Sequence, residues 1–235
     1  MAWRRTLRVL SALVEVYDRV NRVISLLSDV PLRREAVARA APLPNPVLDA
    51  GCGTGAMAKE ALRLRARPEQ LVLLDPLPEM LHRSRQGLKE VAGRVMGIFE
   101  ALPFRPASLG AVLCGFSLRD AANIGRALEE LACALRPQGL LVNVDLGKPD
   151  GPLRSALLGA YWRFVAPLLA AAVIGARGRL YGELYNTYLR YPRLNELKKL
   201  LGLHFEVLWL RTRWLGGVLQ LIASRRAQRA YNIRR

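Results

Sequence analysis

The pattern of hydrophobic and polar positions divides most of the chain into short apolar runs that alternate with amphipathic segments. Five runs end at a turn signal or a polar residue, as buried strands do: 46–50, 71–75, 95–99, 111–116 and 140–146. Helical spacing follows several of them, at 57–66, 76–88 and 123–135. Strands that alternate with helices predict an α/β fold with a parallel sheet covered by helices on both faces.

Both ends of the chain depart from this alternation. Residues 3–28 and 32–41 predict amphipathic helices, 153–200 are helical and rich in aromatic residues, and 204–212 with 216–225 predict a final pair of strands. The whole is then a mostly parallel seven-stranded sheet with an antiparallel edge strand. The helical insertion is expected over the carboxyl ends of the parallel strands, where such sheets bind ligands. We predict a single domain with these parts: 1–235 overall, N-terminal helices at 1–41, a cofactor-binding core at 45–150, a helical lid at 153–200 and a strand pair at 203–226.

The composition adds a strong positive charge to this picture. Lys and Arg together number 36 against 19 Asp and Glu, a formal net charge of +17. Such a field attracts anionic lipid headgroups or nucleic acid. Compositional bias is the alternative, because nearly all the basic residues are Arg. The three cysteines and two histidines have no metal-site or disulfide spacing, so no metal is expected.

Two apolar stretches are too short for a targeting or spanning role. The N-terminal one is interrupted by Glu15, too early for a signal peptide, which predicts a cytoplasmic protein. The uncharged run 164–176 would reach only about 20 Å as a helix. A bilayer core is roughly 30 Å thick, so this run is not expected to span it.

The strongest chemical signal is the turn after the first strand, in the sequence VLDAGCGTG (47–55). Gly51 and Gly53 allow the backbone to turn sharply and to approach a ligand closely, and the amides of the next helix favour negative charge. Asp49 precedes the turn and could hold the ammonium group of an amino-acid cofactor, which a nicotinamide dinucleotide lacks. A purely structural turn is the alternative.

A second signal, Asp75, lies at the end of the second strand. A carboxylate at this place can accept hydrogen bonds from both hydroxyls of a ribose. Pro76, Leu77 and Met80 follow it and offer apolar contacts to an adenine ring. Helix capping is the alternative role for Asp75, although its position after a glycine-rich turn favours the ribose.

Several motifs together resemble a known family. The segments VLDAGCGTG, LLDPLPEML, EALPF (100–104) and LRPQGLLVNVDLGKP (135–149) resemble the class I S-adenosylmethionine (SAM)-dependent methyltransferases. EALPF, GFSLRD (115–120), DLGKP, YDRVN (17–21), TYLRYP and GGVLQLIASR are similar to the ubiquinone/menaquinone biosynthesis C-methyltransferases (demethylmenaquinone methyltransferases). The resemblance covers nearly the whole chain and implies a Rossmann-like fold, with SAM as the methyl donor.

The resemblance also implies roles for individual residues. Gly51, Gly53 and Thr54 hold the methionyl part of SAM, Asp75 binds the ribose and Gly115 lines the cofactor floor. Where the family has an acid or amide followed by alanine, next to the adenine, this chain has Ile98-Phe99.

Near this departure, the backbone at Glu100 and Ala101 is expected to recognise the adenine instead. The family's Asn after the Arg is Asp120 here, and Gly115 stands where the family has serine.

The implied reaction is the C-methylation of the aromatic ring of a prenylated quinol precursor. A ring carbon is a poor nucleophile unless a neighbouring hydroxyl ionises. Arg119 is placed to stabilise that phenolate, and Tyr17 and Asp120 are candidates for proton transfer. A surface salt bridge is the alternative for Arg119, and core packing beside the cofactor is the alternative for Tyr17.

Other functions stay open from the sequence alone. The enzyme could methylate another small aromatic or a lipid; RNA is less favoured, because the fourth strand carries CGFSLRD rather than an N/D-P-P-Y/F motif. A non-catalytic protein at a membrane surface is a further alternative. The aromatic segment 153–192, rimmed by Arg154, Arg163, Arg177 and Arg179, predicts a lid that receives an apolar tail and sits on an anionic membrane, so that the cytoplasmic protein would be peripheral to it. Ordinary helix packing over the sheet is the alternative there.

Overall fold

A seven-stranded sheet forms the centre of the computed structural model, which describes residues 2–227. Its strand order is β3-β2-β1-β4-β5-β7-β6. All strands run parallel except β7, which is antiparallel to both β5 and β6. The strands are β1 (Val47–Ala50), β2 (Leu71–Asp75), β3 (Gly93–Met96), β4 (Leu109–Gly115), β5 (Leu135–Leu146), β6 (Phe205–Arg213) and β7 (Val218–Arg225).

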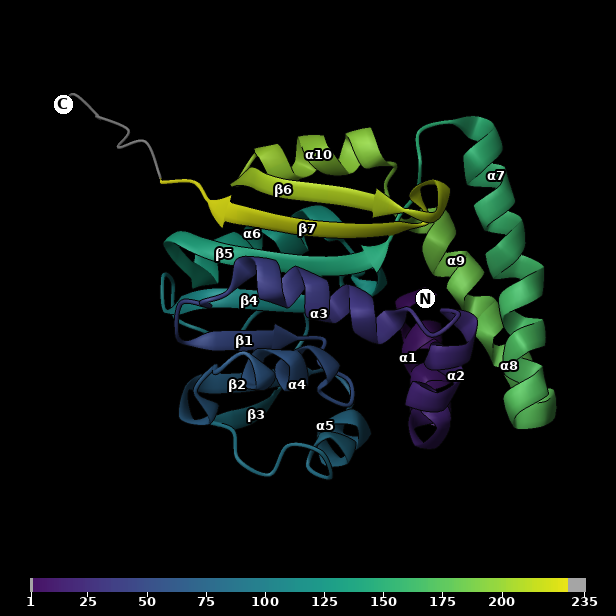
Figure 1. Cartoon of the computed structure of the whole chain (residues 1–235), viewed down its shortest axis with the longest axis horizontal. Helices are drawn as coiled ribbons and strands as arrows, with labels where there is room; N and C mark the ends of the chain where they lie inside the picture. Colours follow the sequence, from purple (N-terminus) through teal and green to yellow (C-terminus); the bar gives the residue numbers. More distant parts are fainter. Residues whose placement is uncertain (1, 228–235) are drawn as a thin grey trace.

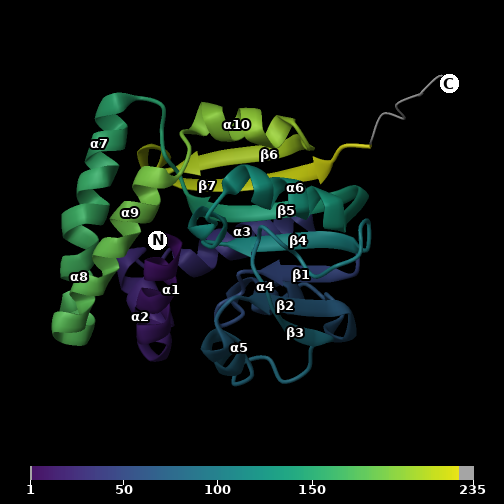
Figure 2. The same ribbon diagram turned by 180° about the vertical axis from the view of Figure 1, so that it is seen from behind.

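Helices cover both faces of this sheet (Figure 1; Figure 2). One face is packed by α3 (Asp29–Ala40) and α4 (Ala56–Arg63), with α5 (Pro78–Ser84) beside β2 and β3. The other face is packed by α6 (Ile124–Ala134) and α10 (Leu194–Gly202). The apolar strands are therefore buried from both sides, as their near-continuous hydrophobic runs predict.

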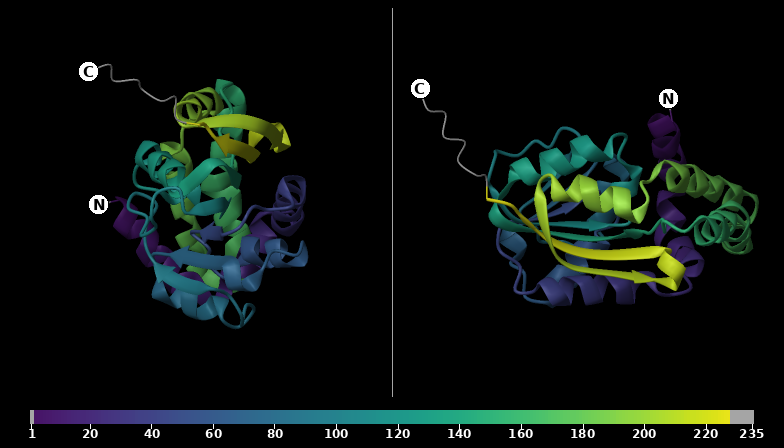
Figure 3. Two further views of the ribbon diagram at one scale, coloured as in Figure 1. Left: turned by 90° about the vertical axis from the view of Figure 1, so that its left-hand side faces the viewer. Right: turned by 90° about the horizontal axis from the view of Figure 1, so that it is seen from above.

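A separate group of helices lies beyond the carboxyl ends of the parallel strands (Figure 1; Figure 3, right). It contains α1 (Ala2–Leu13), α2 (Tyr17–Ile24), α7 (Pro152–Ala160), α8 (Ala166–Ile174) and α9 (Glu183–Arg190). A π-helical turn, Tyr161–Val165, joins α7 to α8. This group has its own core, in which Leu13, Val20 and Ile24 pack with Trp162 and Tyr188.

The predicted fold class is confirmed, with three adjustments. The antiparallel strand, β7, lies one place inside the edge, between β5 and the outermost strand β6. The third strand ends at Met96, because the chain turns back at Phe99 and Glu100 and Ile98 pairs with Ala101 instead of with the sheet. The fifth strand already begins at Leu135 and carries a register shift opposite Leu109/Ala111.

The predicted insertion 153–200 contains two different kinds of helix. Helices α7, α8 and α9 lie beyond the strand ends, whereas α10 packs against α6 and β6 and buries Leu197 and Leu201 in the core of the sheet. The segment that could serve as a lid is therefore α7–α9, and extending it to residue 200 was wrong. Of the predicted single domain 1–235, residues 1 and 228–235 lie outside the described residues.

One helical stretch of the described chain, Pro152–Arg190, passes a test for crossing a membrane by length and composition alone. Its most apolar window has a mean hydropathy of 1.7, and 22% of that window is buried. The predicted non-spanning run 164–176 is only a part of it. In this fold the stretch is not straight: the chain turns after α8 at Gly175, which has φ +64°, and α9 runs back along α7 (Figure 1).

Candidate active site

The glycine-rich turn between β1 and α4 forms one wall of the site. Gly51, Gly53 and Gly55 all have positive φ, which side-chain-bearing residues adopt only with strain. A Cβ atom on Gly51 would lie 2.5 Å from Cβ of Ser117, so the close approach of β4 also requires glycine there. The sequence predicts a sharp turn here that lets the backbone approach a ligand closely, and the positive φ values agree with such a turn.

Asp75 fixes this turn from the neighbouring strand. Its Oδ2 accepts a hydrogen bond from the Gly53 amide at 2.8 Å, and its Oδ1 accepts one from the Leu77 amide at 2.9 Å. Burial raises the pKa of this carboxyl to about 6. Asp75 therefore has the capping role that was the alternative, and it also lines the cavity described next.

A cavity of about 610 Å³, counting the space open to solvent, lies at the carboxyl ends of β1, β2 and β4. Among the predicted site residues, it brings together Tyr17, Gly51, Gly53, Asp75, Pro76, Glu100 and Asp120. Apolar side chains form most of the remaining wall: Trp3, Leu7, Leu10, Leu74, Leu77, Met80, Ile98, Phe99 and Phe116. The cavity thus offers a carboxylate beside apolar walls, an arrangement suited to a nucleoside.

Four predicted cofactor residues do not line this cavity. Asp49 is buried behind the turn, where it accepts a hydrogen bond from the Ala58 amide at 2.9 Å, and burial raises its pKa to about 7. In this structure Oδ2 of Asp49 caps α4, while its Oδ1 is buried without a hydrogen-bond partner among the described residues, so the ammonium contact stays a prediction. A Cβ atom on Gly115 would point at Met57, away from the cavity, and Ala101 lies outside its wall.

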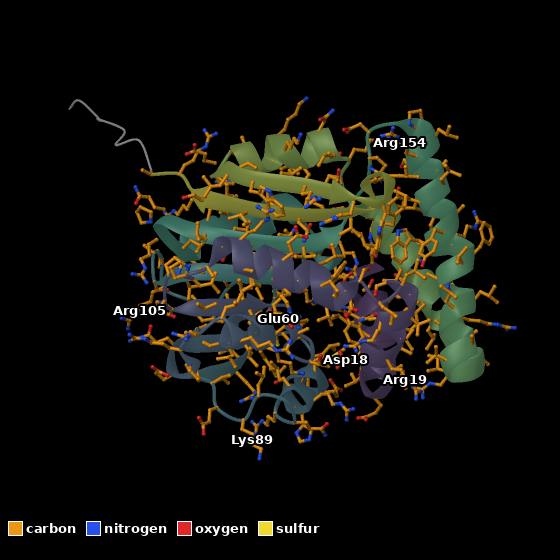
Figure 4. The ribbon with its side chains drawn as sticks, viewed as in Figure 1. Asp18, Arg19, Glu60, Lys89, Arg105 and Arg154 are labelled. Atoms are coloured by element: carbon orange, nitrogen blue, oxygen red, sulfur yellow. The ribbon has the colours of Figure 1, made fainter. Side chains whose placement is uncertain are left out.

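Thr54 is the fourth of these residues. Its hydroxyl donates a hydrogen bond to Asp18 Oδ1 at 2.8 Å, and Asp18 projects from α2 toward the glycine turn (Figure 4). This bond ties the N-terminal helices to the turn, so Thr54 positions the wall that contains Tyr17.

Arg119 is buried at the end of β4, so the alternative of a surface salt bridge was wrong. Its Nη1 donates to Asp145 Oδ1 at 3.1 Å and to the Phe116 carbonyl at 2.5 Å. Its backbone amide donates to Asp145 Oδ2 at 3.0 Å, and its Nε lies 3.7 Å from Asp120 Oδ1. Burial alone would lower the pKa of Arg119, but the carboxylates of Asp120 and Asp145 outweigh it and raise the pKa. Arg119 is a permanent cation in this site.

Two groups beside Arg119 can titrate. Burial raises the pKa of Asp120 to about 6, an effect that the Arg119 guanidinium partly opposes. Burial also raises the pKa of the Tyr17 hydroxyl. At neutral pH the Asp120 carboxylate is therefore mostly ionised and can accept a proton, whereas Tyr17 keeps its own.

Sequence reasoning missed several residues of the site. Phe116 and Ser117 lie inside the segment GFSLRD, so a signal was present, but only the glycine, the arginine and the aspartate of that segment were chosen. Trp3, Leu7 and Leu10 come from α1, whose amphipathic pattern does not reveal what its apolar face covers.

Comparison with known proteins shows to which family the chain belongs. The model of the ubiE/COQ5 methyltransferase family matches residues 3–204. The chain belongs to this family. A demethylmenaquinone methyltransferase of Deinococcus radiodurans is 36% identical over 79% of this chain and 78% of its own. The enzyme of that name from Lactiplantibacillus plantarum is 34% identical over 73% of this chain and 72% of its own.

Solved structures agree on the fold of this ubiE/COQ5 family member. A SAM-dependent methyltransferase from Thermotoga maritima superposes with a TM-score of 0.67 at 17% identity, over 93% of this chain and 99% of its own. The chain is therefore a methyltransferase with the Rossmann-like fold of the SAM-dependent enzymes, and its family implies SAM as the methyl donor.

Proposed function

We propose that this chain methylates a ring carbon of a prenylated quinol of the demethylmenaquinol type. The observation that carries the proposal is the meeting of three groups at one place. Tyr17 and Asp120 enter the cofactor cavity, and the buried cation Arg119 lies directly behind Asp120. The names of the Deinococcus and Lactiplantibacillus relatives support the substrate class.

The residues of the cofactor cavity fit SAM. Asp75 faces the cavity at the end of β2, where it can accept hydrogen bonds from ribose hydroxyls. Met80, Ile98 and Phe99 offer apolar surfaces to the adenine, and Gly53 leaves room beside Tyr17 for the methionyl part. When bound there, SAM supplies a methyl group on a positively charged sulfur.

The chain's own residues then have two tasks. The ring carbon gains a carbon–carbon bond and loses a proton, so negative charge on the neighbouring ring oxygen must be stabilised and the proton accepted. We assign the first task to Arg119, whose charge is fixed before the reaction begins. We assign the second to Asp120, whose pKa of about 6 suits a base at neutral pH. Alignment of the two reactants contributes the rest.

A methyl-transfer assay with radiolabelled SAM tests this function. Demethylmenaquinol, other phenols and total RNA are compared side by side with the purified chain. We expect incorporation with the quinol well above that with the phenols and none above background with RNA. Incorporation confined to another phenol would assign a different small aromatic substrate, and incorporation into RNA would overturn the proposal.

Replacing Asp75 by alanine should weaken SAM binding about 10- to 100-fold. Hydrogen bonds to a charged group contribute about 1.5–3 kcal/mol, and the ribose contact depends on this carboxylate. Isothermal calorimetry measures the affinity, and thermal unfolding checks that the variant folds, because Asp75 also holds the Gly53 and Leu77 amides. An unchanged affinity in a folded variant would remove Asp75 from the cofactor site.

We also propose that the helical insertion α7–α9 receives the apolar tail and docks on an anionic membrane. The buried face of α7 and α8 carries Ser155, Gly159, Trp162, Ala166 and Ala170. The opposite face exposes apolar side chains at helical spacing: Leu153, Leu157, Phe164 and Leu168. A helix face in water is ordinarily polar, so an apolar exposed stripe favours contact with another apolar phase.

The charges near this stripe favour an anionic lipid. Residues 152–182 contain four arginines and no acidic residue. Arg154 lies at the end of α7 that is farthest from α8 (Figure 4), and Arg163 lies next to Phe164 on the exposed side. A basic residue near an anionic surface contributes about 1 kcal/mol, so a few are enough for reversible docking.

The double variant Phe164→Glu/Leu168→Glu should lower binding to anionic vesicles at least about tenfold. These side chains are 63% and 71% exposed, and burying one apolar side chain contributes about 1.5–3 kcal/mol. Co-sedimentation with phosphatidylglycerol vesicles is the measurement. Leu203→Glu is the matched control, since Leu203 is 70% exposed but follows α10 on the sheet.

Binding of the wild type should rise with the anionic lipid fraction and fall with salt. A wild-type protein that stays in the supernatant under every lipid condition would contradict the docking proposal, as would equal losses in the double variant and in Leu203→Glu.

A further inference from the structure

A second cavity lies on the other side of Phe116 from the cofactor cavity. It measures about 390 Å³, counting the space open to solvent. Phe116 lines both cavities, with φ +61° at the end of β4. The walls of the second cavity are partly apolar, from Ile24, Leu146 and Leu184. They also contain two buried nitrogen donors without a hydrogen-bond acceptor in the described chain.

These donors belong to Arg33 and Trp162, whose side chains are both more than nine-tenths buried. The Nε of Arg33 and the Nε1 of Trp162 are buried and donate no hydrogen bond within the described chain. Arg119 also lines this cavity, but its Nε faces Asp120 Oδ1 at 3.7 Å. Leaving a buried donor unpaired costs about 1–3 kcal/mol, so such groups are uncommon without a purpose. Two of them around one cavity indicate that a ligand carries the acceptor.

The two guanidinium groups are already anchored at their other ends. Nη1 of Arg33 donates to Asp29 Oδ2 at 3.0 Å, and Nη1 of Arg119 donates to Asp145. The Arg33 guanidinium also stacks on the Phe116 ring, 4.8 Å from its centroid. Because both side chains are held in place, their remaining donors are pre-organised rather than free to find water.

The second cavity shares wall residues with a cavity that contains the residues proposed for catalysis. Arg119 and Asn21 line the second cavity, and they also line a third cavity of about 360 Å³, counting the space open to solvent. The walls of this third cavity contain Tyr17 and Asp120. Arg119 therefore lies between the second cavity and the place expected for a ring held near Tyr17 and Asp120, and an oxygen of that ring next to Arg119 would face the second cavity. The reacting carbon would stay on the side of the cofactor.

We propose that the second cavity binds the distal oxygen of a two-oxygen aromatic ring, with Trp162 and Arg33 as its recognition residues. This inference rests on the proposed function and adds that the substrate is recognised at both ring oxygens. An oxygen acceptor satisfies the donors of Arg33 and Trp162, and Phe116 offers the ring an aromatic face. Among the described residues of the wall, Asp29 is the one acidic group, and Arg33 neutralises it, so an acceptor is not repelled.

The position of the cavity also suggests the path of the tail. Ile24 and Ser25 form part of the cavity wall, and the next two residues, Leu26 and Leu27, are exposed. The Tyr161 hydroxyl donates to the Ile24 carbonyl at 2.7 Å, which places this turn against the α7–α8 helix. An apolar tail that leaves here would pass the exposed side chains of Leu26 and Leu27.

Trp162→Phe tests the recognition, since it removes the N–H group and keeps an aromatic ring. We expect the KM for demethylmenaquinol to rise about 5- to 10-fold, the effect of one hydrogen bond, with SAM affinity unchanged by calorimetry. The KM for a one-oxygen analogue, a 1-naphthol with the same tail, should be the same in variant and wild type. Trp209→Phe on β6 is the matched control and should change neither KM.

Arg33→Lys is the second variant, because it keeps a cation beside Asp29 but removes the Nε donor. It should also raise the KM for the quinol and leave the naphthol unaffected. Equal quinol KM values in the wild type and in both folded variants would overturn the second-oxygen site and leave the proposed function standing. A wild type that binds SAM but never methylates the quinol would overturn the proposed function, and this inference with it.

Discussion

Replacing Arg119 by alanine is expected to lower kcat about 10²- to 10³-fold while SAM affinity changes little. A fall in kcat of this size is typical when an enzyme loses one hydrogen-bond donor that stabilises a developing negative charge. The interaction strengthens as the ring oxygen ionises, so its loss acts mainly on turnover. Arg119 does not line the cofactor cavity, which is why SAM binding should survive. Single-turnover kinetics and calorimetry measure the two effects separately.

The same substitution also affects stability, and the experiment must account for this. Asp145 is fully buried, and Arg119→Ala removes the guanidinium that neutralises it. The backbone amides of residues 119 and 146 still donate to the carboxylate, but its buried charge loses the opposite charge of Arg119. Breaking such a pair costs about 3–5 kcal/mol. The double variant Arg119→Ala/Asp145→Asn removes the charge and is the form in which turnover should be compared. Equal losses of turnover and SAM affinity in that variant would make Arg119 a structural residue.

Replacing Asp120 by asparagine is expected to lower kcat about 10²- to 10⁴-fold, the usual contribution of a positioned base. The pH dependence gives an independent readout. Burial raises the pKa of Asp120 to about 6, and a base acts only when it is deprotonated. Turnover of the wild type should therefore rise with pH through about 6 and level off above it.

The variant should lose this acidic limb of the profile. The profile is measured at saturating SAM, because Asp75 also has a pKa of about 6 and belongs to the cofactor site. Asp150→Asn is the control, since Asp150 is exposed, accepts a hydrogen bond from the Asn195 amide and lines none of the three cavities described above. A folded Asp120→Asn variant with wild-type turnover and the same acidic limb would show that another group accepts the proton.

The sheet and the glycine turn could be predicted from the sequence because their signals are local. An apolar run such as residues 71–75 has few alternatives to a buried strand, and Asp75 follows from the end of that run. Gly51 and Gly53 mark a turn whose φ values require glycine. The cavity at this turn contains both of these glycines and Asp75, as the spacing of the motifs predicts.

The remaining features depend on where side chains point and on which elements pack together, and the sequence pattern does not show either of these. The sequence places Asp49 just before the turn, but it does not show on which side of the backbone the carboxylate lies. In the structure this carboxylate caps α4. The amphipathic pattern of α10 is the same whether the helix belongs to a lid or to a sheet, so Leu197 and Leu201 were misassigned. Arg33 and Trp162 come together only through the packing of α3 and the π-helical turn at the strand ends.

The identity of the methylated product tests the central claim most directly. The chain is incubated with demethylmenaquinol and SAM that carries a ¹³C-labelled methyl group, and the extracted product is examined by NMR and mass spectrometry. The account predicts one added methyl group, bonded to a ring carbon, with the ring proton at that position lost. A methyl group found on a ring oxygen, or a quinol recovered unmethylated from a chain that binds SAM, would contradict it.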